Sequence, residues 1–283
     1  MGVEQMTYRK SGVDYDAMDP FKRAAQLAGR RTANSLKRFG ITEVEESRGE
    51  SAYLIEFPSF FLAHVQEGLG TKNLVADAMR NLNNKRCSYY HQVAQDTVAM
   101  IVNDLITVGA LPLSVAMHLA AGNSNWFKDQ QRCQELIDGW QSACKLAGAT
   151  WAGGETPTLR DIIDPNTVEL SGSAVGLIKP KSLRIKPENI RSGDRIVIFS
   201  SSGIHANGLT MARKIAARHP DGYLAVLSDG KTFGETLLEP TVIYVKAIEA
   251  LQQLGVRIHY AVNITGHGWR KLMRATEPFV YTI

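Results

Sequence analysis

The 283-residue sequence lacks the features of membrane and nucleic-acid-binding proteins. It has no uncharged apolar run of about 18 residues, the length that suggests a membrane-spanning helix. Its N-terminal MGVEQMTYRKSG has no apolar core like that of a signal peptide. The net charge is +4, but Lys and Arg are scattered without a block, which argues against nucleic acid and fits small anionic ligands. We therefore expect a globular protein with a small-molecule substrate and no membrane or nucleic-acid partner.

Cysteine is also scarce. Cys87, Cys133 and Cys144 form no CxxC pair, cannot all pair with one another and lack the spacing of metal ligands. A reducing compartment, the cytoplasm, is the simplest location for such a chain.

Hydrophobic periodicity predicts alternating helices and strands in two domains. The expected helices cover residues 20–39, 89–109, 128–146, 208–218 and 240–254, and the expected strands cover residues 51–57, 167–178, 195–201 and 257–262. Residues 179–194, between the strands expected over residues 167–178 and 195–201, are rich in Pro and charged residues, which predicts a domain boundary. We expect an N-terminal domain over residues 1–180 and a C-terminal domain over residues 190–283.

The stretch HVQEGLGTKNLVADAM, which begins at His64, carries the first candidate site. Gly68 and Gly70 let backbone N–H groups approach a ligand, and Thr71 offers a hydroxyl group. Lys72 offers a positive charge and Glu67 a cation ligand. This inventory suits a phosphate with its metal, although the spacing is neither GxxxxGK[ST] nor GxGxxG. A plain turn is the alternative.

Three polar residues share one face of the helix expected over residues 89–109. Asp96 and Asn103 are about 20° apart around the helix axis, and Asp96 and Asp104 about 80°. Paired oxygen ligands of this kind suit Mg²⁺. The alternative is that this face of the helix is exposed to solvent, because such a face also carries polar residues.

Two further loops carry polar residues. WAGGETP presents Glu155 and Thr156 after a double glycine, where a structural hairpin is the alternative. SSSGIHANGL lies between an expected strand and an expected helix, where backbone amides attract anions. There His205 and Asn207 are candidates for substrate contact or proton transfer, and an ordinary hydrogen-bonded histidine is the alternative.

Several segments resemble, in their order, the aminoimidazole ribonucleotide synthetase family, also called phosphoribosylformylglycinamidine cyclo-ligase. They are YRKSGVDYDA, EGLGTK, QDTVAMIVNDLITVGALPL, AGGETP, SSGIHANGLTMARK, LLEPTVIYVK and ITGHGW. SSGIHANGL and LLEPTVIYVK favour this family over the related selenophosphate synthetases, thiamine-monophosphate kinases and hydrogenase-maturation proteins.

The resemblance implies an α+β fold of two α/β domains. The N-terminal domain would dimerise through β-strands and bind ATP, and the C-terminal α/β domain would complete the substrate cleft of a homodimer. The implied reaction, in de novo purine biosynthesis, cyclises formylglycinamidine ribonucleotide to aminoimidazole ribonucleotide with release of ADP and phosphate. The implied cofactors are ATP and Mg²⁺.

The resemblance, taken with the loop and helix patterns, assigns roles to particular residues. The metal ligands would be Glu67 and Asp96, and the catalytic residues Lys72, His205 and Asn207. The nucleotide would be bound by Gly68, Gly70, Thr71, Lys72, Asn103, Asp104, Glu155 and Thr156. We also expect Asp96→Asn to leave folding intact.

The chain departs from the family pattern at four places. Glu67 replaces the usual aspartate, SRGESAYLI keeps one glycine (Gly49) of a glycine-rich stretch, and His267 interrupts a glycine run. Family members continue well beyond Ile283, so we expect an incomplete C-terminal domain. These departures leave two alternatives: a catalytically silent nucleotide-binding dimer, and an ATP-dependent phosphotransferase with another substrate.

Overall fold

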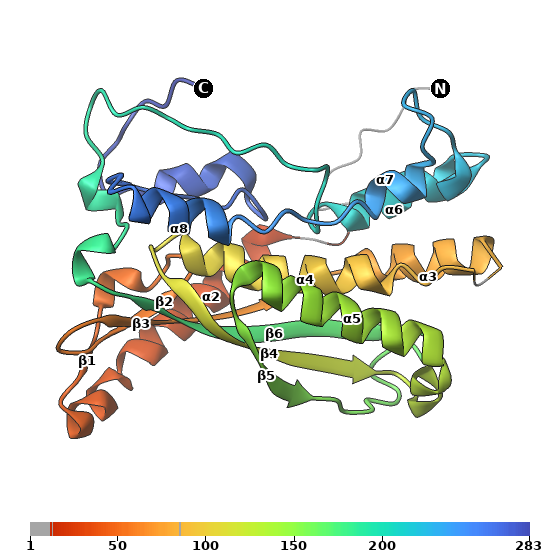
Figure 1. The fold of residues 1–283 in the computed structure, drawn as a ribbon, viewed down its shortest axis with the longest axis horizontal. Coiled ribbons are helices and arrows are strands. Elements are labelled where there is room, and N and C mark those ends of the chain that lie inside the picture. The colour runs from red at the N-terminus through yellow and green to blue at the C-terminus, as the bar shows by residue number, and fades with distance from the viewer. Residues whose placement is uncertain (1–11, 13, 85) are drawn as a thin grey trace.

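The computed structural model describes residue 12, residues 14–84 and residues 86–283, which form an α+β fold (Figure 1). The strands are β1 (Thr42–Glu43), β2 (Tyr53–Glu56), β3 (Phe61–Gly68), β4 (Leu111–Ala121), β5 (Thr150–Glu155) and β6 (Val168–Ile178). The α-helices are α2 (Tyr15–Arg30), α3 (Lys72–Leu82), α4 (Tyr90–Ile106), α5 (Gln130–Ala147), α6 (Leu209–Arg218), α7 (Phe233–Leu237) and α8 (Val245–Gln253). Short 3₁₀ helices are η1 (Ala33–Phe39), η2 (Glu45–Ser47), η3 (Ser124–Lys128), η4 (Lys181–Leu183), η5 (Pro187–Asn189), η6 (Gly222–Leu224) and η7 (Gly268–Arg274).

The strands form one mixed sheet in the order β1-β2-β3-β6-β4-β5. β4 and β5 are parallel, and the other neighbours are antiparallel. Helices α4 and α5 lie together on one face of the sheet (Figure 1). Along β6, fully buried residues alternate with partly exposed ones, as expected for a sheet that packs on a core through one face only.

Glycines in β6 set the distance between α4 and the sheet. A Cβ atom on Gly172 would lie 2.8 Å from Ile101 Cδ1, and one on Gly176 would lie 2.5 Å from Leu105 Cδ2. Both distances are shorter than real Cβ contacts, so the two glycines let the α4 side chains pack directly onto the β6 backbone. The apolar strand expected over residues 167–178 is thus confirmed.

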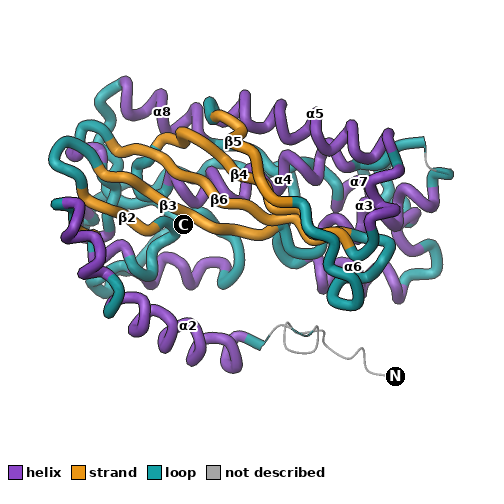
Figure 2. Tube along the Cα trace, turned by 90° about the horizontal axis from the view of Figure 1, so that it is seen from below, coloured by secondary structure: helices purple, strands orange, loops and turns teal. Residues whose placement is uncertain are grey.

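The helix expected over residues 20–39 is divided into α2 and η1. Thr32 lies between the two pieces and donates its hydroxyl hydrogen to the Gly29 carbonyl. No residue of α2 or η1 is buried, and α2 extends along the outside of the molecule (Figure 2). Because α2 and η1 bury no side chain in the core, packing does not stabilise one continuous helix, and local hydrogen bonds decide where α2 ends.

The second half of the chain differs from expectation at three places. Within the described residues no strand follows β6, so the strands expected over residues 195–201 and 257–262 are wrong. The first of these segments has no neighbouring strand to pair with, and Val197 is 74% exposed. The helix expected from residue 240 begins only at Val245, because backbone groups of the preceding residues are hydrogen-bonded to side chains of α4. Among the described helices, none has the length and apolar character to span a bilayer.

Candidate functional site

The EGLGTK loop connects β3 directly to α3. Gly70 has φ +78°, a left-handed conformation that glycine adopts without strain. A Cβ atom on Gly70 would lie 3.9 Å from the Ala206 carbonyl oxygen. Thr71 is the N-cap residue of α3, and its side chain makes no capping hydrogen bond. The loop therefore lies beside the SSGIHANGL segment, as the two candidate motifs require.

Lys72, the first residue of α3, forms a buried ion pair with Asp96 of α4. The Lys72 ammonium lies 2.9 Å from Asp96 Oδ1 and 2.8 Å from Oδ2, and it also donates to the Glu239 carbonyl oxygen at 2.7 Å. Both side chains are 0% exposed. Burial raises the pKa of Asp96 and lowers the pKa of Lys72, and the attraction between the two charges opposes both shifts.

Asp96 also binds the segment that precedes α8. The Thr241 backbone N–H donates to Asp96 Oδ1 at 2.8 Å, and the Thr241 hydroxyl donates to the same oxygen. Asn103, on the same helix face, donates to the Val242 carbonyl at 2.8 Å and accepts from the Tyr244 N–H at 3.0 Å. The helix face that carries Asp96 and Asn103 thus binds a distant segment of the chain. Asp96 and Thr241 are 145 residues apart in the sequence.

Glu67 and Asp104 form a second acidic cluster. Their side chains are hydrogen-bonded to each other, and Asn263 donates to Asp104 Oδ1 at 2.8 Å. Burial, followed by the charge of Asp104, raises the pKa of Glu67 to about 7, while the charge of Lys271 lowers it. Close to pH 7, Glu67 therefore keeps a proton that an exposed glutamate would have lost.

The two predicted metal ligands consequently have different neighbours. Asp96 contacts Lys72 and Thr241, whereas Glu67 contacts Asp104. In the described part of the chain, no group of three or more His, Cys, Asp or Glu side chains is arranged to hold a metal ion. The assignment of Glu67 and Asp96 as a metal pair stays a prediction.

His205 adopts a left-handed backbone conformation with φ +57°. Its Nε2 atom accepts a hydrogen bond from the Ser202 backbone N–H at 3.1 Å and lies 3.0 Å from the Ser202 hydroxyl oxygen. Burial, and next the charge of Lys72, lowers the pKa of His205. The lowered pKa favours the neutral ring, and the Nε2 lone pair of that ring accepts the Ser202 N–H, so His205 can take a proton at Nε2 only after this hydrogen bond opens.

Three predicted site residues, Asn207, Glu155 and Thr156, lie outside the Lys72–Asp96 and Glu67–Asp104 pairs. Asn207 donates to Met100 Sδ of α4 at 3.7 Å. Glu155 is exposed at the end of β5. No hydrogen bond or ion pair within the described residues joins Glu155 or Thr156 to the EGLGTK loop or to Asp96. The structure thus brings the EGLGTK loop beside the SSGIHANGL loop, whereas the WAGGETP loop lies at the same end of the sheet, three strands away from the EGLGTK loop.

His267 connects the N-terminal helix to the second half of the chain. Its ring centroid lies 4.1 Å from that of Tyr15 in α2, and its Nε2 atom lies 3.9 Å from Asp19 Oδ1. A Cβ atom on the neighbouring Gly266 would lie 3.9 Å from Asn207 Oδ1. The His267 side chain thus packs against α2, and the residue before it lies close to Asn207 of the SSGIHANGL segment.

Sequence reasoning missed four contributors to these clusters: the Glu239 carbonyl and the side chains of Thr241, Asn263 and Lys271. Thr241 lies in a segment expected to be helical, and Asn263 follows one expected to be a strand. Thr241 belongs to the motif LLEPTVIYVK, and Asn263 and Lys271 lie on either side of the motif ITGHGW, so both regions were recognisable in the sequence. Only the fold shows which of their polar groups face α4.

Two family models match the chain: the N-terminal domain of AIR synthase related protein over residues 52–178, and its C-terminal domain over residues 191–272. The phosphoribosylformylglycinamidine cyclo-ligase of Pyrococcus horikoshii is 37% identical over 274 residues, which are 96% of this chain and 75% of that protein. The corresponding protein of Thermococcus kodakarensis is 35% identical over 96% of this chain and 76% of its own length. That of Synechocystis is 34% identical over 93% of this chain and 73% of its own length.

Comparison with solved structures shows a similarity in fold. A HypE–HypF complex is 16% identical in sequence, superposes with a TM-score of 0.52, and matches 79% of this chain and 62% of the compared chain. Identity this low supports the fold alone. The sequence relatives carry the stronger conclusion: the chain belongs to the AIR synthase family, together with the phosphoribosylformylglycinamidine cyclo-ligases of these organisms.

Proposed function

We propose that the chain is a phosphoribosylformylglycinamidine cyclo-ligase, which cyclises formylglycinamidine ribonucleotide to aminoimidazole ribonucleotide at the expense of ATP. The observation that carries this proposal is the match to cyclo-ligases of at least 34% identity over at least 93% of the chain. The contact between the EGLGTK and SSGIHANGL loops supports it, because a phosphate loop and a proton acceptor are then neighbours.

The proposed chemistry converts a poor leaving group into a good one. The γ-phosphoryl group of ATP passes to the formyl oxygen and leaves ADP. The ribose-bearing amidine nitrogen then attacks the formyl carbon, the C–O bond breaks with release of phosphate, and the nitrogen loses its proton as the ring closes. Most of the catalytic effect comes from positioning and charge neutralisation.

Particular residues would perform these tasks. Backbone N–H groups near Gly68 and Gly70, with the Thr71 hydroxyl, would bind the phosphates. Lys72 would neutralise charge on the transferring group. His205, whose pKa burial lowers, would accept the proton from the ring nitrogen once Nε2 is released from the Ser202 N–H, and Asn207 would orient the substrate.

Mg²⁺ would neutralise phosphate charge when bound. The donor chemistry of the Glu67–Asp104 pair fits the ion, because two neighbouring carboxyl groups supply the hard oxygen ligands that Mg²⁺ prefers, and binding would displace the proton that the raised pKa of Glu67 retains. Asp96 is already bonded to Lys72 and Thr241. A metal role for Asp96 therefore requires that Lys72 turn away from it, toward the phosphates.

We place the active protein in the cytoplasm as a homodimer. Free thiols at Cys87, Cys133 and Cys144 support a reducing compartment. The sheet face opposite α4 and α5 supports subunit pairing, because it carries partly exposed residues such as Val175 and Leu177 of β6.

The boundary between the two domains at residues 180–190 also remains our proposal. Separate family models on its two sides support it.

The decisive experiment incubates the protein with ATP, Mg²⁺ and formylglycinamidine ribonucleotide while ADP and aminoimidazole are both followed. We expect the two products to form in equal amounts. ADP formation only with a different acceptor would identify a phosphotransferase, and nucleotide binding without turnover would identify a catalytically silent dimer. Either result would overturn the cyclo-ligase proposal.

A further inference from the structure

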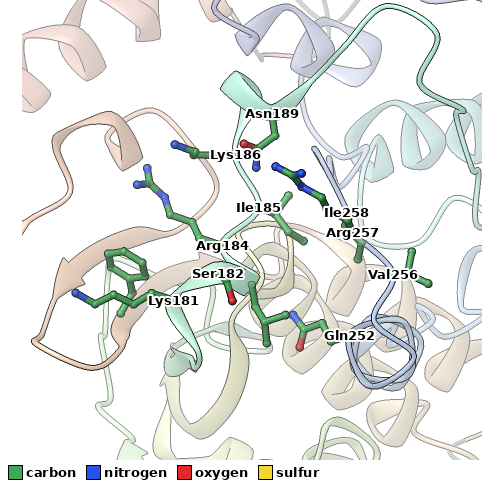
Figure 3. Close-up of a pocket in the computed structure, with 12 residues that line it drawn as sticks. Lys181, Ser182, Arg184, Ile185, Lys186, Asn189, Gln252, Val256, Arg257 and Ile258 are labelled. Carbon is green, nitrogen blue, oxygen red and sulfur yellow. The ribbon is translucent and has the colours of Figure 1, made fainter.

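A pocket of about 580 Å³ (Figure 3) lies at the end of β3 opposite the EGLGTK loop. Its walls come from the start of β3 at Phe61, from the chain that follows β6 (residues 181–189), and from the end of α8 with the residues after it (residues 252–258). Phe61 and Gly68 mark opposite ends of β3. Seven residue steps of a strand separate the pocket from the EGLGTK loop by roughly 23 Å.

Positive charge dominates the pocket. Its lining includes Lys181, Arg184, Lys186 and Arg257, and no carboxylate among the described residues. Lys181 is neutralised by Glu56 at 2.7 Å, and Arg184 is 3.8 Å from Glu46, whose side chain is 65% exposed.

Lys186 and Arg257 are the strongest candidates for binding an anion. Neither forms an ion pair with a carboxylate in the described ranges. Figure 3 shows that they reach the pocket from two different segments of the chain. A ligand carrying two negative charges would neutralise them together.

The walls of the pocket are held in position without a ligand. The Ile185 N–H donates to the Val108 carbonyl at 3.1 Å, and the Lys186 N–H donates to the His259 carbonyl at 3.3 Å. The Arg184 guanidinium lies 5.6 Å from the centroid of the Phe61 ring, where the negative face of the ring attracts it. Arg184 is only 17% exposed, so its guanidinium is presented in a restricted geometry.

The pocket also has an apolar part. Val256, which is 45% exposed, and Ile258 contribute aliphatic surface beside the cations. A ligand that complements both parts carries an anionic head and an apolar body, and the volume lies within the range of small-molecule sites.

We propose that this pocket binds a small phosphorylated metabolite. Arg184, Lys186 and Arg257 would hold the phosphate group, and Val256 and Ile258 would contact the remainder. A phosphate matches this set better than a carboxylate, because it offers a second negative charge and three acceptor oxygens that suit the forked guanidinium groups. The site is separate from the proposed ATP site and does not depend on the proposed reaction. A bound ligand would join the chain that follows β6 to the segment after α8.

The test measures binding of phenyl phosphate, a probe with one phosphate group and an apolar body. Isothermal titration at constant ionic strength compares wild type with the double variant Lys186→Gln/Arg257→Gln. The matched control is Lys128→Gln/Arg218→Gln, which removes two exposed positive charges elsewhere. We expect the control to bind like wild type and the pocket variant to bind at least about tenfold more weakly, since hydrogen bonds to charged groups are lost.

Hydrogen–deuterium exchange of wild type locates the bound probe. We expect phenyl phosphate to protect backbone amides in residues 181–189 and 252–258. Unchanged affinity in the pocket variant, protection confined to the EGLGTK loop, or no binding by wild type at millimolar probe would each overturn the proposal. Melting curves without probe verify that the variants are folded, and Arg257→Gln alone replaces the double variant if that one is not.

Discussion

Lys72 and Asp96 pair inside the protein, with the ammonium 2.8 Å from Asp96 Oδ2 and both side chains 0% exposed. One residue begins the helix after the phosphate-loop candidate and the other lies in the central helix. The same carboxylate accepts hydrogen bonds from Thr241. The pair therefore joins three segments that are far apart in the sequence.

Asp96→Asn should destabilise the protein, contrary to the expectation from sequence that folding would survive. The amide leaves the Lys72 charge buried without its counter-ion, which costs about 3 kcal/mol or more of unfolding free energy. Urea unfolding measures the loss. The double variant Lys72→Met/Asp96→Leu removes both charges and should lose less than the two single variants together. Asp138→Asn, at an exposed position of α5, serves as the control. A loss below about 1 kcal/mol for Asp96→Asn would contradict the structural role of the pair.

Glu67→Gln should raise the Mg²⁺ concentration needed for half-maximal activity by about tenfold or more, because it removes a negatively charged oxygen ligand. The proposed cyclisation is assayed over a Mg²⁺ titration, again with Asp138→Asn as the control. Overlapping Mg²⁺ curves for wild type and Glu67→Gln would remove Glu67 from the metal site.

Stability without metal should fall as pH rises from about 4.5 to about 7. The pKa of Glu67 is about 7 in the folded protein, against an ordinary value of 4.5 for a glutamate side chain. The folded state therefore binds more protons than the unfolded state between these values. The stabilisation is complete below the lower pKa and is lost as pH rises through the upper one. The facing groups are Asp104, Asn263 and Lys271.

Chemical unfolding at a series of pH values measures this dependence. Glu67→Gln should flatten the curve in this range, because its side chain does not titrate. Glu169→Gln, which changes an exposed carboxylate on β6, should keep the wild-type slope. Parallel curves for wild type and Glu67→Gln would show that the slope comes from other groups.

His205→Ala should lower turnover by about a hundredfold while the dissociation constant of ATP changes less than about twofold. The reason is that His205 would act on the substrate proton and not on the nucleotide. Steady-state kinetics and nucleotide titration give the two quantities, and His219→Ala, at an exposed position, is the control. Equal turnover in His205→Ala and wild type would leave His205 without a catalytic role.

A homodimer should be found in solution, because the sheet face opposite α4 and α5 is not covered by those helices (Figure 1). Light scattering at micromolar concentration should return twice the chain mass of 31.2 kDa. A monomer mass under these conditions would argue against pairing through the sheet.

The sequence alone determined the family, the main helices and the strand over residues 167–178, because these depend on local periodicity and on motifs read along the chain. It also brought Asp96, Asn103 and Asp104 to one helix. Tertiary structure decided what that helix face contacts. Asp96 and Asn103 bind the segment before α8, and Asp104 binds Glu67 and Asn263. Tertiary structure also decided that residues 195–201 and 257–262 are not strands, since a strand needs a hydrogen-bonded neighbour that its own sequence does not specify. The pocket that contains Lys186 and Arg257 has the same origin, because cations far apart in the sequence form one site only where the fold brings their segments together.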